Sequence, residues 1–115
     1  MANTFKLVSK AGVTSADVIY TVASSTTTVI LGLMLGNTTG SQITATVSLA
    51  SDTSNRTNAN DEDNQTVELI TDTPIPSGSS LELLAGNKVV METTDALSVT
   101  ATGACDVILS IMEMT

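Results

Sequence analysis

The chain has 115 residues, of which 42% are hydrophobic, and it carries a net charge of −8. This length suits one domain, and the hydrophobic share indicates a packed core and excludes a disordered chain. Only four residues are basic and they are scattered, which argues against binding to nucleic acid or to an anionic membrane. Aromatic residues make up 2% of the chain, so aliphatic and methionine side chains must fill the core.

The first two predicted elements are strands. Residues 3–9 and 17–22 carry apolar side chains at every second position, the period of a β-strand with one buried face. Gly12 marks a turn at residues 11–15 between them. Each strand is expected to place its apolar residues on a single face: Phe5 and Leu7 in the first, and Val18, Tyr20 and Val22 in the second.

Residues 26–35 form the most hydrophobic segment, and strict alternation makes both of its faces apolar. A strand that is apolar on both faces is covered on both faces. The cover is either a loop of the same chain or a second subunit, and the sequence leaves the two open. Alternation assigns Val29, Leu31, Leu33 and Leu35 to one face and Ile30, Gly32 and Met34 to the other.

Residues 42–50 show the clearest pattern of a half-buried strand. Thr and Ser occupy the outward positions, where β-branched polar residues suit the exposed face of a sheet. A turn rich in Gly, Asn and Thr at residues 36–41 predicts that this strand pairs with the preceding one as a hairpin. The inward positions are Ile43, Ala45, Val47 and Leu49.

Residues 51–65 have no apolar periodicity and predict a long exposed loop. Loops of this length are usually functional or disordered. Carboxylate and amide oxygens are ligands that Ca²⁺ accepts, but their spacing does not match an EF-hand. We favour a solvated charged loop and keep a calcium site as the alternative. The polar residues concerned are Asp52, Asn60, Asp61, Glu62, Asp63 and Asn64.

The remainder of the chain predicts further short strands at residues 66–71, 79–84, 88–92, 97–101 and 106–114, with a rigid proline turn at 73–78. The last strand again looks covered on both sides, with Val107, Leu109 and Ile111 on one face and Ile108, Met112 and Met114 on the other.

The whole chain is therefore expected to be a single all-β domain, an antiparallel β-sandwich or jelly-roll-like barrel of about eight strands. The second faces of residues 26–35 and 106–114 predict an interface between subunits at Met34, Ile108, Met112 and Met114.

The residue types argue against catalysis. The chain has no His, which removes Ser-His-Asp and Cys-His mechanisms within one chain. Cys105 is the only cysteine, lies among apolar strand residues and is expected to be a buried thiol. Asp72-Thr73-Pro74 differs from the Asp-Thr-Gly of aspartic proteases, because proline cannot replace the glycine that lets the backbone turn tightly. We expect no enzymatic activity, no cofactor and no catalytic or metal site.

Two stretches resemble a known class of protein: Ile-Pro-Ser-Gly-Ser-Ser-Leu-Glu-Leu-Leu at residues 75–84 with Gly-Asn-Lys at 86–88, and Val-Ile-Leu-Ser-Ile-Met-Glu at 107–113. With the Thr-rich start of the segment at residue 26, they resemble small virion structural proteins of tailed bacteriophages, particularly phages of marine and cyanobacterial hosts. The resemblance implies a non-enzymatic protein present in many copies on the particle.

The function expected from these features is a head decoration or cement protein that docks on the capsid as a homo-oligomer. Its partners are other copies of itself and the major capsid protein or other virion proteins, and its location is the virion, assembled in the host cytoplasm. Two alternatives remain: a neck, tail or fibre-attachment protein of the virion, and a Ca²⁺-dependent module that binds a host surface or carbohydrate.

Overall fold

The structure, a computed structural model, describes residues 2–52, 65–84 and 87–115. These residues form nine strands and no helix, so no described helix is available to cross a membrane. The strands are β1 (Asn3–Val13), β2 (Asp17–Thr21), β3 (Thr27–Asn37), β4 (Ile43–Ala50), β5 (Thr66–Ile75), β6 (Ser80–Leu83), β7 (Val89–Met91), β8 (Ala96–Ala101) and β9 (Cys105–Met114).

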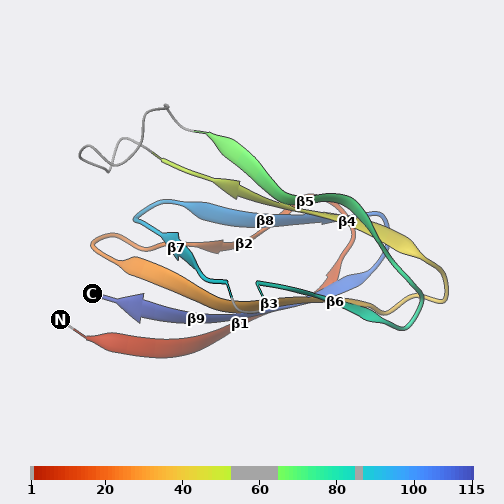
Figure 1. Cartoon of the computed structure of the whole chain (residues 1–115), viewed down its shortest axis with the longest axis horizontal. Helices are drawn as coiled ribbons and strands as arrows, with labels where there is room; N and C mark the ends of the chain where they lie inside the picture. Colours follow the sequence, from red (N-terminus) through yellow and green to blue (C-terminus); the bar gives the residue numbers. More distant parts are fainter. Residues whose placement is uncertain (1, 53–64, 85–86) are drawn as a thin grey trace.

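The strands form two sheets that pack face to face as a sandwich (Figure 1). Sheet 1 has the order β1-β9-β3-β6, with β7 also pairing with β3, and sheet 2 has the order β2-β8-β4-β5. Every pairing is antiparallel. With the short β7 set aside, this is the order of a jelly roll, in which paired strands wrap together from one sheet to the other. The predicted fold class is confirmed, in its jelly-roll form.

The hairpin predicted between residues 26–35 and 42–50 is wrong, because β3 lies in sheet 1 and β4 in sheet 2. The side chain of Asn37 explains how the connection turns inward. Its Nδ2 donates hydrogen bonds to the carbonyl oxygens of Ser41, at 2.8 Å, and Ile75, at 2.9 Å. These bonds tie the connection to β5 of the opposite sheet.

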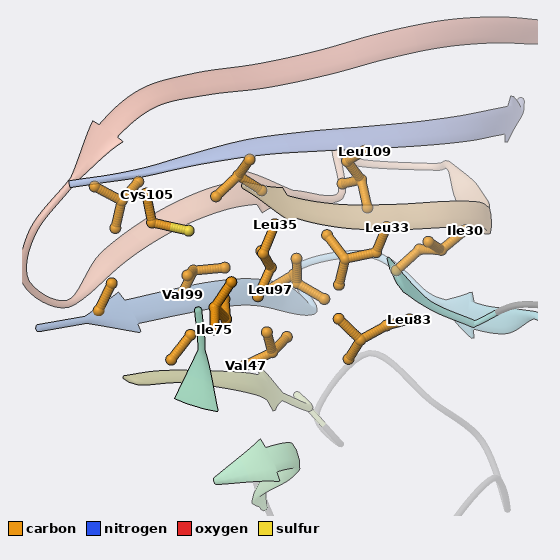
Figure 2. Close-up of a cluster of buried hydrophobic side chains, with 14 of the residues drawn as sticks. Ile30, Leu33, Leu35, Val47, Ile75, Leu83, Leu97, Val99, Cys105 and Leu109 are labelled. Atoms are coloured by element: carbon orange, nitrogen blue, oxygen red, sulfur yellow. The ribbon is translucent and has the colours of Figure 1, made fainter. Parts of the chain in front are cut away.

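The core lies between the sheets, and its side chains point toward one another from both layers (Figure 2). Neighbouring strands contribute matched pairs in register, such as Leu33 with Leu109 in sheet 1 and Val47 with Val99 in sheet 2. The buried apolar residues are aliphatic apart from Met91 and Cys105, as the composition predicts. The inward positions predicted for β4 and β9 are confirmed, with Leu49 only partly buried.

The strict alternation predicted for residues 26–35 is wrong beyond Ile30. Ile30 pairs with Ile111, but the next pair is Gly32 with Ser110, so Leu31 is an extra residue in a β-bulge. An extra residue reverses the parity of the strand that follows it. Ile30 therefore faces the core together with Leu33, whereas alternation had placed them on opposite faces.

The same error affects the N-terminal strands. A register shift between Val18 and Tyr20 turns Val18 outward, where it is 59% exposed, although Val22 is buried. The turn predicted from residue 11 begins too early, because β1 continues to Val13 through a second register shift. Gly12 lies in that shift with a φ of +67°, a backbone conformation that glycine adopts without strain.

Candidate docking face

The outer face of sheet 1 carries a row of apolar residues that crosses the sheet, and it also carries the polar residues Ser110 and Glu82. Phe5 of β1 pairs with Met112 of β9, Met112 pairs with Val29 of β3, and Val29 pairs with Val90 of β7. These residues form one row across four strands, and Phe5 and Val90 at its ends are 71% and 60% exposed. We call this surface the apolar face; it consists of Phe5, Leu7, Val29, Met34, Val90, Ile108, Met112 and Met114.

All four residues predicted as an interface lie on the apolar face. Met34 and Ile108 are direct cross-strand partners and are 39% and 46% exposed. Met112 and Met114 follow on β9 at the same parity and are partly exposed. Sequence reasoning did not identify Phe5, Leu7 and Val90 as members, because alternation shows that residues share a face without showing which face is solvent. It also placed Val29 on the face opposite Met34, which is wrong because the bulge at Leu31 reverses the parity between them.

The outer face of sheet 2 has the opposite character. Hydroxyl side chains lie opposite one another on β4 and β8, with Thr46 paired to Thr100 and Ser48 paired to Ser98. Thr44 extends the same row of β4. The outer face of sheet 1 is therefore largely apolar, whereas that of sheet 2 carries hydroxyl groups along β4 and β8 and the exposed Val18 on β2.

A cluster of polar side chains joins the sheets at one end of the sandwich. The Tyr20 hydroxyl donates to Oε2 of Glu113 over 2.5 Å and lies 2.8 Å from Oγ1 of Thr28. Nζ of Lys6 lies 2.7 Å from Oε1 of Glu113. Burial and the neighbouring carboxylate raise the pKa of Tyr20 to about 12, and hydrogen bonds from Lys6 and Tyr20 lower the pKa of Glu113. The neutral Tyr20 phenol and the Glu113 carboxylate are therefore hydrogen-bonded to each other and connect the two sheets. Neither group of this cluster is free to act as a nucleophile or base.

Two other groups considered for catalysis are Cys105 and Asp72. The thiol of Cys105 is fully buried, as predicted, and burial followed by the charge of Asp106 raises its pKa and disfavours the reactive thiolate. Asp72 is exposed on β5, and its backbone N–H donates to Oγ1 of Thr46 over 2.9 Å. This exposed position differs from the enclosed carboxylate pair of an aspartic protease.

Metal binding has one remaining candidate region. Among residues 2–52, 65–84 and 87–115 no cluster of acidic or cysteine side chains could hold a metal ion. Asp52 lies at the start of the predicted acidic loop, and its carboxylate accepts a hydrogen bond from the Thr94 hydroxyl over 2.7 Å. The other residues considered for Ca²⁺, from Asn60 to Asn64, lie outside the described residues.

Comparison with known proteins gives no family. No family model and no curated protein matches the chain. One solved structure that matches comes from work titled "Bacillus endospore appendages form a novel family of disulfide-linked pili". It is 12% identical, the match covers 99% of this chain and 87% of that chain, and the TM-score is 0.49. At this level of similarity, nothing about function transfers.

Proposed function

We propose that this chain is a non-enzymatic structural subunit that docks through its apolar face on a larger protein assembly. The observation that carries the proposal is the contrast between the two outer faces. The apolar face suits burial against protein, and the hydroxyl-bearing face of sheet 2 suits solvent. Contiguous exposed apolar surface of this kind marks interaction sites on soluble proteins.

The energetics of docking are favourable. Burying a Leu- or Met-sized side chain contributes roughly 1.5–3 kcal/mol. The apolar face offers several such side chains, which together offset the roughly 4–15 kcal/mol entropic cost of association. The net charge of −8 keeps the undocked protein soluble.

The assembly we propose is a phage head, with the chain as a decoration protein and the major capsid protein as its partner. The resemblance of residues 75–88 and 107–113 to small virion proteins supports this assignment. Jelly rolls occur in viral capsid proteins but also in lectins and cupins, so the fold is compatible with the assignment without selecting it.

The location is tested on purified particles. Particles from a culture that produces the chain are banded in a density gradient and labelled with a gold-conjugated antibody against it. Regular labelling over the head supports decoration. Labelling restricted to the neck or tail moves the protein to another virion position, and particles free of the chain overturn the virion assignment.

The docking face is tested with Met112→Lys. A lysine in the centre of the apolar row places a charge where burial is required, so we expect loss of attachment to the particle with a normal β-sheet circular dichroism spectrum. The matched control is Thr100→Lys on the exposed hydroxyl-bearing face, which should attach like the wild type. Equal attachment of both variants contradicts docking through the apolar face.

A further inference from the structure

The outer edge of β1 is an unpaired strand edge. In the part of the chain that the structure describes, β1 pairs with β9 alone, and it forms the border of sheet 1 (Figure 1). It is eleven residues long, without proline. An exposed, long, apolar edge strand is a template for pairing with another strand.

The register with β9 identifies the backbone groups that face outward. Ala2 and Thr115 exchange two backbone hydrogen bonds, at 3.2 and 3.0 Å. Because bonded and non-bonded pairs alternate in antiparallel strands, the N–H and C=O groups of Asn3 and of every second residue that follows it point away from β9. The residues whose backbone N–H and C=O groups point to the free edge of the sheet are Asn3, Phe5, Leu7 and Ser9.

Within residues 3–10, the regular part of β1, only the two lysines could block this edge, because the bulge between Lys10 and Val13 lies beyond it. Charged side chains, especially lysines, commonly protect an edge strand. Lys6 and Lys10 are the only charged residues of β1, and both are engaged by their own chain, Lys6 with Glu113 at 2.7 Å and Lys10 with Asp17 at 3.6 Å. Both lysines lie on the inner side of sheet 1, opposite Ile111 and Val107, so the outer side of β1 carries no charged residue.

The outer strands of sheet 2 are protected by comparison. β5 carries Pro74, a positive φ at Asp72 and two register shifts against β4. β2 has five residues and a register shift of its own. Bulges, proline and shortness are the devices that keep strand edges from pairing.

We propose that β1 pairs antiparallel with β1 of a second copy of this chain about a two-fold axis. A two-fold axis places the edge opposite itself, so the outward-facing residues of one copy meet those of the other. Phe5 and Leu7, which are 71% and 69% exposed, then pack against the second copy.

The sequence of β1 selects one register. The regular part of the strand runs from Asn3 to Lys10, before the shift in pairing with β9. Two registers overlap this part most fully, one centred on Lys6 and one on Leu7. Centring on Lys6 places the two Lys6 side chains directly opposite each other, which is destabilising. Centring on Leu7 pairs Leu7 with Leu7, Phe5 with Ser9 and Lys6 with Val8.

The dimer joins the two copies of sheet 1 into one continuous sheet. Directly opposite residues on paired strands point to the same side. The two apolar faces therefore lie side by side on one surface of the dimer and form a platform twice as wide as that of one copy. The pairing itself requires no particle, so it can fail in solution while docking through the apolar face still holds.

The register is tested by cross-linking. In the proposed dimer the two Leu7 Cα atoms lie about 5.5 Å apart, within the range that a disulfide spans. Leu7→Cys should form a disulfide-linked dimer under mild oxidation, and the buried Cys105 should not interfere. Phe5→Cys should not form a disulfide-linked dimer. In the proposed register Phe5 lies opposite Ser9, so the two Phe5 residues are four positions, or about 14 Å, apart along the strands. Val67→Cys, 53% exposed on β5, is the control for random collision. Equal cross-linking of all three variants, or of Phe5→Cys alone, overturns the proposal.

The pairing is tested without altering an apolar residue. Ser9→Pro removes an N–H that points away from β9, so it spares the pairing with β9 but obstructs a second copy. Sedimentation equilibrium should show dimers for the wild type and for Ser9→Ala, and at least tenfold weaker dimerisation for Ser9→Pro with an unchanged β-sheet spectrum. A wild type that stays monomeric at millimolar concentration, or Ser9→Pro dimers as stable as those of the wild type, overturns the proposal.

Discussion

Gly103 lies in the turn between β8 and β9, where the side chain of Ile43 leaves no room for a Cβ. A Cβ at this position would lie 2.7 Å from Cγ2 of Ile43 and 3.5 Å from Cγ2 of Thr39. Ile43 is buried and cannot move freely, so Gly103→Ala should destabilise the fold by about 1–3 kcal/mol, the usual cost of overpacking. The measurement is urea unfolding against Gly40→Ala, because a Cβ at Gly40 meets nothing within 4 Å. Equal unfolding midpoints for the two variants would contradict the steric explanation.

Single residues differ in how far the sequence predicts their surroundings. Burial of Cys105 follows from its apolar neighbours on an alternating strand, and the structure confirms it. The role of Asn37 does not follow, since its partners at Ser41 and Ile75 meet only after the chain has crossed between sheets. A polar residue next to a turn gives no local sign that its side chain is 4% exposed.

The bulge in β3 controls which face each later residue of that strand presents. Deleting Leu31 makes the register with β9 continuous, from Ile30 opposite Ile111 to Gly32 opposite Ser110. Every other side chain keeps its face, so the deletion should leave a folded protein with a modest loss of stability. Inserting Ala after Leu33 instead reverses the faces of Met34 and Leu35 and should abolish cooperative unfolding.

Thermal denaturation followed by circular dichroism distinguishes the two variants. If the insertion variant unfolds as cooperatively as the deletion variant, β3 accommodates extra residues freely. The bulge at Leu31 then does not determine which face each later residue of β3 presents.

Bulges also limit prediction of the elements. Periodicity locates each strand in the described residues to within a few positions, and it predicts both faces of β4 and β9 correctly. It fails within β2 and β3, because one extra residue reverses the parity without changing the composition. The four residues predicted as an interface nevertheless share one face, since Met34 lies beyond the bulge and β9 keeps its alternation throughout.

At the scale of the whole molecule, the assignment of strands to sheets depends on contacts between distant residues. β1 pairs with β9 from the opposite end of the sequence, and β3 and β4 are neighbours in sequence but lie in different sheets. Local turn residues at 36–41 favour a hairpin, but β3 and β4 lie in different sheets and contribute their inward-facing apolar residues to one core. The apolar face consequently combines residues from β1, β3, β7 and β9, which no local pattern groups together.

The polar cluster around Glu113 connects the two sheets, and it should make the stability of the whole sandwich depend on pH. Tyr20 belongs to sheet 2, whereas Lys6, Thr28 and Glu113 belong to sheet 1. Hydrogen bonds from Lys6 and Tyr20 lower the pKa of Glu113 from its usual 4.5. A group whose pKa is lower in the folded state stabilises that state above the unfolded pKa, and this contribution is lost as the pH falls through the folded pKa. We therefore expect the free energy of unfolding to decrease below about pH 4.5 as Glu113 is protonated.

Glu113→Gln isolates this contribution from that of the other carboxylates. The amide cannot ionise, so the variant should be less stable than the wild type at neutral pH, by about 1–3 kcal/mol for the loss of hydrogen bonds to a charged group. The two proteins should approach each other in stability as the pH falls, because acid removes from the wild type the interaction that the variant already lacks. Urea unfolding of both proteins between about pH 3 and pH 7 measures the difference. A stability difference that stays constant over this range would show that the Glu113 carboxylate does not hold the two sheets together through its charge.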